Sequence, residues 1–299
     1  MKISQVEAVP ILVPLKAGLT TKTAHGEHID SPYVIVRVHT DEGLIGLGEA
    51  TLAPRWSGET SPSCVAAIRD LLDPALRGAD PRNVRSCLMQ INRALKLNPF
   101  TKAAVEMALW DVAGKAAGQP LYRLLGGKVR ETLPMKMVVG AFEVPKAVAL
   151  AEQFLDWGVC HLKVKVGLDP EQDIERVQAV RNLAGPEVTV GIDANCGWNI
   201  TTARRMLREM EALNIAFAEQ PVGVEDPNAL GQLRSASTIP IMADESVFTL
   251  ADAWDLVRRD AVDILSIYPG KTGGILPAMA IASVAEAAGV VCSMGSNLE

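Results

Sequence analysis

The strongest constraint on the fold is a repeat of short apolar segments in the C-terminal part of the chain. Amphipathic stretches typical of helices separate these segments, and a strand with its crossover helix needs about this spacing. Seven such runs begin, 23 to 27 residues apart, near Met135, Leu162, Val188, Ile215, Pro240, Asp263 and Gly289. A series this regular favours a TIM-like (β/α) barrel, with an open doubly wound sheet as the alternative.

The barrel is expected to be incomplete. A barrel of this type closes with eight strands, whereas only seven runs are present and the last ends near Met294. An unclosed parallel sheet would leave two unpaired edges. We therefore expect residues 131–299 to form seven strands of a modified (β/α)7β barrel, and the chain to be a fragment of a longer one.

Residues 1–130 show a different pattern. Strands are expected at 6–13, 33–38 and 44–50, with Asp41-Glu42-Gly43 as the turn of a hairpin. Helices are then expected to begin at Ser61-Pro62 and Asp80-Pro81, and a third to run from 101 to 117. Strands followed by helices predict a separate α+β domain.

Composition excludes several classes of function. Of the 299 residues 48% are hydrophobic and 21% charged, which rules out a largely disordered chain. The chain has a net charge of −6 and no run of basic residues, unlike a protein that binds nucleic acid or an anionic membrane surface. Without a signal peptide or an apolar run of about 20 residues, we expect a cytoplasmic protein. Five scattered cysteines argue against a disulfide framework or a structural zinc site.

Three acidic residues follow consecutive strands of the repeat. Asp193, Glu219 and Asp244 are 26 and 25 residues apart, and each stands where its strand ends. The carboxyl ends of parallel barrel strands meet at one face, where catalytic groups cluster. Three bare carboxylates there would repel one another, and a hard divalent cation removes that repulsion. The sequence thus predicts a Mg²⁺ or Mn²⁺ site. The alternative for any single Asp at a strand end is that it caps the N-terminus of the helix that follows.

Lysines face these acids from both sides. Lys163 and Lys165 are two residues apart in one strand, so both point into the barrel. Lys271 follows the sixth strand, which lies across the barrel from the second. A metal bound to a substrate carboxylate stabilises the enolate that forms when the α-proton leaves. Lys165 and Lys271 are the expected acid and base groups, and the Lys163 ammonium keeps its neighbour neutral.

These residues resemble the enolase superfamily, in particular its muconate cycloisomerase subgroup. The resemblance covers nearly the whole chain. It rests on Gly48-Glu49-Ala50, Leu124-Leu125-Gly126-Gly127, Lys163-Val164-Lys165, Asp193-Ala194-Asn195, Glu219-Gln220-Pro221, Ala243-Asp244-Glu245-Ser246 and Lys271-Thr272-Gly273-Gly274. It implies the three acids as metal ligands, Lys165 and Lys271 as acid/base groups, and Lys163 as an aid at the substrate carboxylate.

The resemblance further implies that the N-terminal domain caps the barrel and closes two loops over its mouth. In the second loop, Arg55 is a candidate to pair with a second carboxylate of a diacid and Trp56 to cover an apolar part, with a solvated loop as the alternative. In the first loop, His25 and His28 are expected to be exposed. Asn195 and Glu299 are further candidate substrate contacts, and family members continue past Glu299.

Three functions stay open. The first is lactonisation of a muconate-type diacid. The second is racemisation or epimerisation of an N-acylamino acid or dipeptide, or a related succinylbenzoate dehydration. The third is a non-catalytic binding relic or inactive fragment. For the catalytic hypotheses the partner is a small carboxylate substrate, with no nucleic acid and no membrane, and a homo-oligomer is expected.

Overall fold

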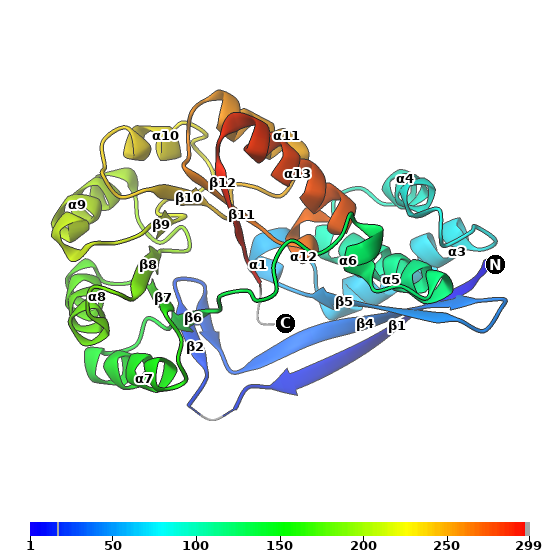
Figure 1. Ribbon diagram of the computed structural model, residues 1–299, viewed down its shortest axis with the longest axis horizontal. Coiled ribbons are helices and arrows are strands. Elements are labelled where there is room, and N and C mark those ends of the chain that lie inside the picture. Colours follow the sequence, from blue (N-terminus) through cyan, green and yellow to red (C-terminus); the bar gives the residue numbers. More distant parts are fainter. Residues whose placement is uncertain (17, 297–299) are drawn as a thin grey trace.

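The computed structural model describes residues 1–16 and 18–296, which form two sheets of different kind (Figure 1). The N-terminal sheet is antiparallel, in the order β1-β4-β5, and a small β2–β3 hairpin projects from it towards the barrel. The strands are β1 Ile3–Pro14, β2 Thr21–Thr23, β3 Gly26–His28, β4 Asp30–Thr40 and β5 Ile45–Thr51.

Helices cover one face of this sheet (Figure 1). They are α1 Pro54–Ser57, α2 Ser61–Ala67, a π-helical turn η1 Ile68–Leu72, α3 Asp73–Leu76, α4 Val84–Ala94, α5 Pro99–Ala117 and α6 Leu121–Leu124. The expected strands and the helix at Ser61 are present. The helix expected at Asp80 instead begins at Val84, because the Asp80 carboxylate accepts the Arg82 backbone N–H (3.0 Å) and closes a turn there.

The contact between β5 and α5 is unusually close. Gly46 and Gly48 face the helix, where a Cβ atom on Gly48 would lie 1.9 Å from the backbone oxygen of Ala104. Only glycine lets the two backbones approach this far. Gly48 therefore fixes how α5 packs on the sheet, and with it the position of the helix that later contacts the barrel.

The second sheet is parallel and seven-stranded, in the order β12-β11-β10-β9-β8-β7-β6. Its strands are β6 Lys136–Val139, β7 His161–Lys165, β8 Thr189–Asp193, β9 Ala218–Glu219, β10 Ile241–Ala243, β11 Ile264–Ile267 and β12 Val291–Met294. They curve into an arc with helices outside it (Figure 1). The predicted TIM-like barrel with an N-terminal α+β capping domain is confirmed, and the open doubly wound sheet was the wrong alternative.

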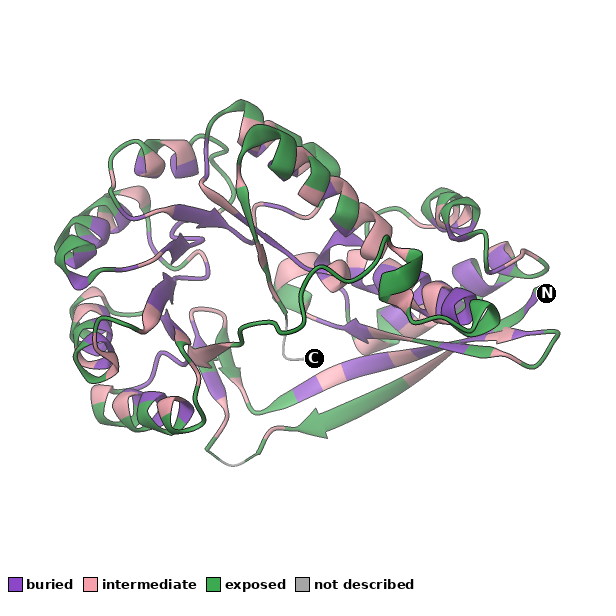
Figure 2. Ribbon diagram, in the orientation of Figure 1, coloured by how far each residue is buried: buried purple, intermediate pink, exposed green. Residues whose placement is uncertain are grey.

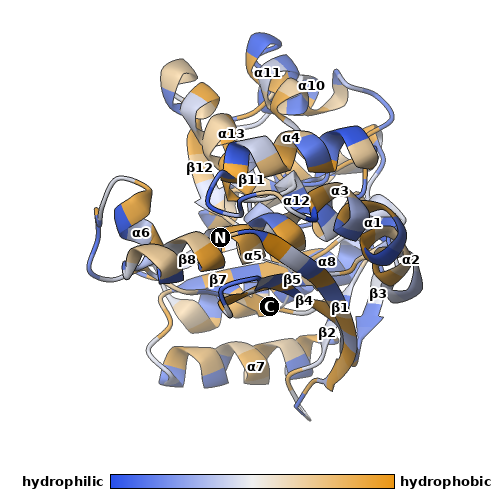
Figure 3. Ribbon diagram, turned by 90° about the vertical axis from the view of Figure 1, so that its right-hand side faces the viewer, coloured by the Kyte–Doolittle hydropathy of each residue, from blue (hydrophilic) through white to orange (hydrophobic). Residues whose placement is uncertain are grey.

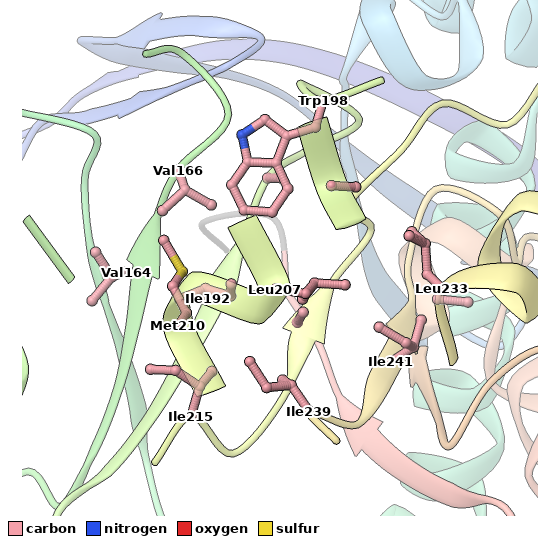
Figure 4. Close-up of a cluster of buried hydrophobic side chains, with 14 of the residues drawn as sticks. Val164, Val166, Ile192, Trp198, Leu207, Met210, Ile215, Leu233, Ile239 and Ile241 are labelled. Atoms are coloured by element: carbon pink, nitrogen blue, oxygen red, sulfur yellow. The ribbon is translucent and has the colours of Figure 1, made fainter. Parts of the chain in front are cut away.

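The outer helices give the barrel its core. They are α7 Val144–Asp156, α8 Pro170–Ala184, α9 Ile200–Met210, η2 Glu211–Leu213, α10 Ala229–Arg234, α11 Leu250–Arg258, α12 Pro269–Thr272 and α13 Ile275–Ala288. The strands β7 to β11 are mostly buried, and the helices are exposed on their outer side (Figure 2). In the side view α7 alternates hydrophilic and hydrophobic residues along its length (Figure 3). Val164, Ile192 and Ile241 of the strands pack against Trp198, Leu207 and Leu233 (Figure 4).

The two ends of the arc are open. Among the described residues β6 pairs only with β7 and β12 only with β11, and most of β12 is exposed (Figure 2). The predicted domain boundary at 130/131 falls in the segment between α6 and β6. None of the helices in the described part of the chain is long and apolar enough to cross a membrane.

Gly48→Ala tests the close packing of β5 on α5. The added methyl group meets backbone rather than a flexible side chain, so we expect a loss of about 1–3 kcal/mol in the free energy of unfolding. Gly231→Ala in α10 is the control, since its Cβ would lie 3.5 Å from Ala261. Urea unfolding should show the loss for the first variant and none for the second. Equal midpoints would contradict the packing described here.

Candidate active site

A cavity of about 1250 Å³ lies inside the arc of strands, between the barrel and the capping domain. Barrel residues line it along the length of the strands, from the first residues of β6, β7 and β8 to the C-terminal strand ends, together with segments of the β2–β3 hairpin and the region around α1. Six of the predicted site residues on the barrel side line it: Lys163, Lys165, Asp193, Asn195, Glu219 and Asp244.

The three predicted acids end three adjacent strands. Asp193 closes β8, Glu219 closes β9 and Asp244 follows β10. In the sheet Asp193 is paired with Glu219, and the residues around them keep the same register. All three are at most 3% exposed. A buried carboxylate requires a compensating charge or hydrogen bonds, so this concentration of acid needs cations nearby.

Lys163 and Lys165 supply two of those cations. Both point from β7 into the cavity, as their spacing predicted. The Lys163 ammonium lies 2.8 Å from Asp193 Oδ2 and 3.0 Å from Glu219 Oε2. The Lys165 ammonium lies 2.6 Å from the same Asp193 oxygen and donates to Asn195 Oδ1 at 2.7 Å. Asp193 is therefore shared between two amines.

Lys271 supplies the third cation, from the opposite side of the acid cluster. It stands in α12, the single turn after β11, and is fully buried. Its ammonium donates to Asp244 Oδ1 (2.5 Å), to the Asp244 backbone oxygen (2.7 Å) and to the Ser266 backbone oxygen (2.9 Å). Unlike Lys165, it is not among the residues that line the cavity.

Burial and pairing shift the pKa values of this cluster in different directions. Burial alone would raise the pKa of Asp193, but the charges of Lys163 and Lys165 outweigh it and hold the pKa below its ordinary value. Burial would lower the pKa of Lys163, and the surrounding carboxylates raise it instead. For Glu219 and Asp244 burial prevails and raises the pKa of each.

A second layer of polar contacts holds the strand ends in place. The fully buried Gln220 accepts the backbone N–H groups of Asp244 (3.0 Å) and Ser246 (3.1 Å), and it donates to Ser246 Oγ (2.8 Å). Gln220 thereby ties the end of β9 to that of β10. Asn195, Cys196 and Gln220 all have positive φ angles, a strained conformation that proteins retain mostly at functional sites.

The donor set fits a hard divalent cation. The predicted ligands offer only carboxylate oxygens, and the neighbouring Glu245 has a buried Oε2 atom without a hydrogen-bond partner. Within the described residues, however, no three His, Cys, Asp or Glu side chains are grouped so that they could hold a metal ion. Their oxygens face the three ammonium groups instead. The role of Asp193, Glu219 and Asp244 as metal ligands stays a prediction.

Residues of the capping domain reach into the mouth of the cavity. Arg55 and Trp56 line it as predicted, and the Trp56 ring lies 6.0 Å from that of Tyr268. His25 and His28 also line it, so the expectation that they are simply exposed was wrong. His25 Nε2 is 3.0 Å from Glu245 Oε1, which also accepts from Asn195. This contact joins the β2–β3 hairpin to the barrel. The sequence around either residue does not predict it.

The sequence analysis missed one lysine of the cavity. Lys136 begins β6, and its ammonium lies 3.9 Å from Glu219 Oε2 and 5.3 Å from the centre of the Phe217 ring. Burial and the charge of Lys163 lower its pKa. The alternation that identified Lys163 applies to β6 as well, since Lys136 and Val138 point to one face. Glu299, a predicted substrate contact, lies outside the described residues.

Comparison with known proteins places this fold and site in a family. Residues 5–126 match the mandelate racemase / muconate lactonizing enzyme N-terminal domain, and residues 146–299 match the enolase C-terminal domain-like family. The chain belongs to the enolase superfamily and is an enzyme of that superfamily. The resemblance inferred from the motifs is thus confirmed at the level of the superfamily.

Curated relatives align with the whole chain. It is 39% identical to the L-Ala-D/L-Glu epimerase of Bacillus subtilis, 36% to a chloromuconate cycloisomerase of Cupriavidus pinatubonensis and 33% to the N-succinyl-L-Arg/Lys racemase of Bacillus cereus, and spans 81–82% of their lengths. A substrate-liganded structure of the B. subtilis enzyme superposes with a TM-score of 0.96, covering all of this chain and 83% of that one. A Cytophaga hutchinsonii dipeptide epimerase complexed with Mg and D-Ala-L-Val, 35% identical, gives 0.95 over 100% and 80% of the chains.

Magnesium titration tests the candidate metal ligands. An ion that binds only the folded protein stabilises it by about 2.7 kcal/mol at a hundred times its Kd, so millimolar Mg²⁺ should raise the thermal midpoint. Asp193→Asn should abolish most of that increase. Asp263→Asn is the control, because Asp263 pairs with Arg234 at the other end of the strands. If Mg²⁺ does not change the thermal midpoint of the unmodified protein, the result would contradict the metal site.

Proposed function

We propose that the protein is a divalent-metal-dependent isomerase that removes and returns the proton α to a substrate carboxylate, and that it racemises or epimerises an N-acylamino acid or a dipeptide. One observation supports this above the others. Lys165 and Lys271 approach the same buried acid cluster from β7 and from the turn after β11, on opposite sides. Inversion at a carbon needs one group to take the proton from one face and another to deliver it to the other.

A bound Mg²⁺ or Mn²⁺ ion would supply positive charge beside the substrate carboxylate and lower the cost of the enolate. Asp193, Glu219 and Asp244 would hold that ion. Their three negative charges balance those of Lys163, Lys165 and Lys271 in the structure described. A divalent cation would add two positive charges beside the substrate carboxylate, where the second negative charge of the enolate develops. Loss of the α-proton turns the substrate monoanion into a dianion, which these positive charges would stabilise more than the monoanion.

The protein's own residues would move the proton. Lys165 opens onto the cavity, and Asn195 and Asp193 fix the direction of its ammonium. A lysine takes up a proton only in its neutral form, so Lys165 would act as the base in that form. Lys163 would then contact the substrate carboxylate. Burial of Lys271 excludes water from the amine that serves the opposite face.

The substrate class rests on the relatives and on the mouth of the cavity. The relatives with named epimerase and racemase activities include a 39% identical L-Ala-D/L-Glu epimerase and a 33% identical N-succinyl-L-Arg/Lys racemase. Arg55 and Arg130, neither of which belongs to a barrel strand, line the cavity and add positive charge to it. We therefore expect a substrate with a second anionic group, held apart from the reacting carboxylate.

Lactonisation of a muconate-type diacid, the first expectation from the sequence, is the second candidate. The buried position of Lys271 favours it, because lactonisation at one face needs only the amine that reaches the cavity. The 36% identical chloromuconate cycloisomerase supports it as well. A homo-oligomer in the cytoplasm stays a prediction under either function.

A panel of substrates in heavy water distinguishes these functions. With Mg²⁺ present, N-acylamino acids and dipeptides should gain one deuterium at the α-carbon, seen by mass spectrometry, and lose optical rotation. Loss of diene absorbance with cis,cis-muconate would support lactonisation instead. Absence of both reactions, with Mg²⁺ bound, would support the binding relic and contradict the proposal.

Lys165→Ala tests the proposed base. We expect turnover to fall by about 10²–10⁴-fold, the usual contribution of a general base, with the fold and Mg²⁺ binding retained. Circular dichroism and the Mg²⁺-dependent thermal midpoint check those two properties. Lys128→Ala, in an exposed loop, should keep its activity. Retained turnover in Lys165→Ala would exclude Lys165 as the base.

A further inference from the structure

Glu106 is a fully buried carboxylate whose role the proposed reaction does not explain. It lies in the middle of α5, in the capping domain, and is 0% exposed. Within the described residues no lysine or arginine forms an ion pair with it, and burial raises its pKa. A charge in such a place is costly unless hydrogen bonds compensate for it. Its partners therefore indicate what it is there to hold.

The partners of Glu106 belong mainly to the barrel. Its Oε2 accepts the backbone N–H of Ile275 (2.8 Å) and its Oε1 that of Leu276 (3.0 Å). These are the first two residues of α13, so a carboxylate of one domain caps a helix of the other. The positive end of the helix dipole stabilises the carboxylate, and the tryptophan of the next turn, Trp110, adds a third hydrogen bond (3.0 Å).

The segment before α13 is shaped around this carboxylate. Gly274 has φ of 130°, and a Cβ atom on it would lie 2.6 Å from Glu106 Oε2. The Gly274 backbone N–H donates to the Pro269 oxygen (2.8 Å), and Thr272 Oγ1 donates to the Tyr268 oxygen (3.1 Å). Residues 268–274 thus form a compact turn. Its last residue packs against Glu106, and Lys271 is in its middle.

We propose that Glu106 is a positioning residue for Lys271: the capping domain, through Glu106, anchors the turn that directs the Lys271 amine at the acid cluster. This proposal rests on the function proposed above. The positioning role of Glu106 follows from the connectivity, because α12 is only four residues long and joins β11 to α13 directly. β11 fixes one end of the turn, and Glu106 fixes the other.

The matched experiment compares Glu106→Gln with Asp73→Asn. The glutamine side chain keeps the volume of glutamate but presents an N–H₂ group to one of the backbone donors. Asp73 is also a buried capping-domain carboxylate that accepts a backbone N–H, from Val6 (2.7 Å), but that partner and Arg77, which also donates to it, are both in the same domain. The two variants should lose comparable stability, whereas only the first should disturb Lys271.

The kinetic measurement follows α-proton exchange in heavy water for each epimer of a substrate separately. Each epimer presents its proton to one lysine. Glu106→Gln should slow exchange by about 10- to 100-fold for the epimer served by Lys271, as expected for a misplaced catalytic group, and by less than about 3-fold for the other. Asp73→Asn should slow neither. Equal slowing of both epimers, or no slowing, would overturn the positioning role.

Amide hydrogen exchange tests the anchor without a substrate. Peptides covering residues 268–276 should exchange faster in Glu106→Gln than in the unmodified protein, and at the unmodified rate in Asp73→Asn. Unchanged protection in Glu106→Gln would overturn the proposal. If the unmodified protein exchanges no α-proton of any substrate, the proposed function fails, and the protection of this turn alone decides whether Glu106 anchors it.

Discussion

The structure depends on a cluster of buried charges that must compensate one another. Asp193, Glu219 and Asp244 end adjacent strands and are almost completely removed from water. Each needs a cation: the Lys163 ammonium lies 2.8 Å from Asp193 and 3.0 Å from Glu219, and the Lys271 ammonium lies 2.5 Å from Asp244. Removing one member of such a cluster leaves an uncompensated charge in the protein interior, where the dielectric constant is low. The same need for opposite charges makes the cluster suited to bind an additional ion and an anionic substrate.

The capping domain completes this arrangement in two places. At the mouth of the cavity, the hairpin residue His25 contacts Glu245, and Trp56 packs near Tyr268. Behind the cavity, Glu106 caps α13 and holds the turn of Lys271. The second contact depends on the position of α5, which the close approach at Gly48 sets. The domain therefore contributes to the chemistry as well as to access.

Local patterns predicted the barrel and the centre of the site. The period of the strands indicated the fold, and the alternation within β7 correctly placed Lys163 and Lys165 on one face. Contacts that join distant segments left no such pattern. The contact of His25 with Glu245 spans 220 residues of sequence. The Asp80 turn was misread because a proline after an acid also suits a helix start. The roles of the ligands and amines remain predictions, since side-chain positions alone do not assign a reaction.

Anomalous diffraction from crystals soaked in Mn²⁺ would test the central claim most directly. The account predicts one strong peak with a carboxylate oxygen from each of Asp193, Glu219 and Asp244 at about 2.0–2.3 Å, close to the distances of oxygen ligands around small divalent ions. It also predicts that the ammonium groups no longer contact those oxygens as they do here. The absence of a peak between the three acids, or a peak held by other residues, would contradict it.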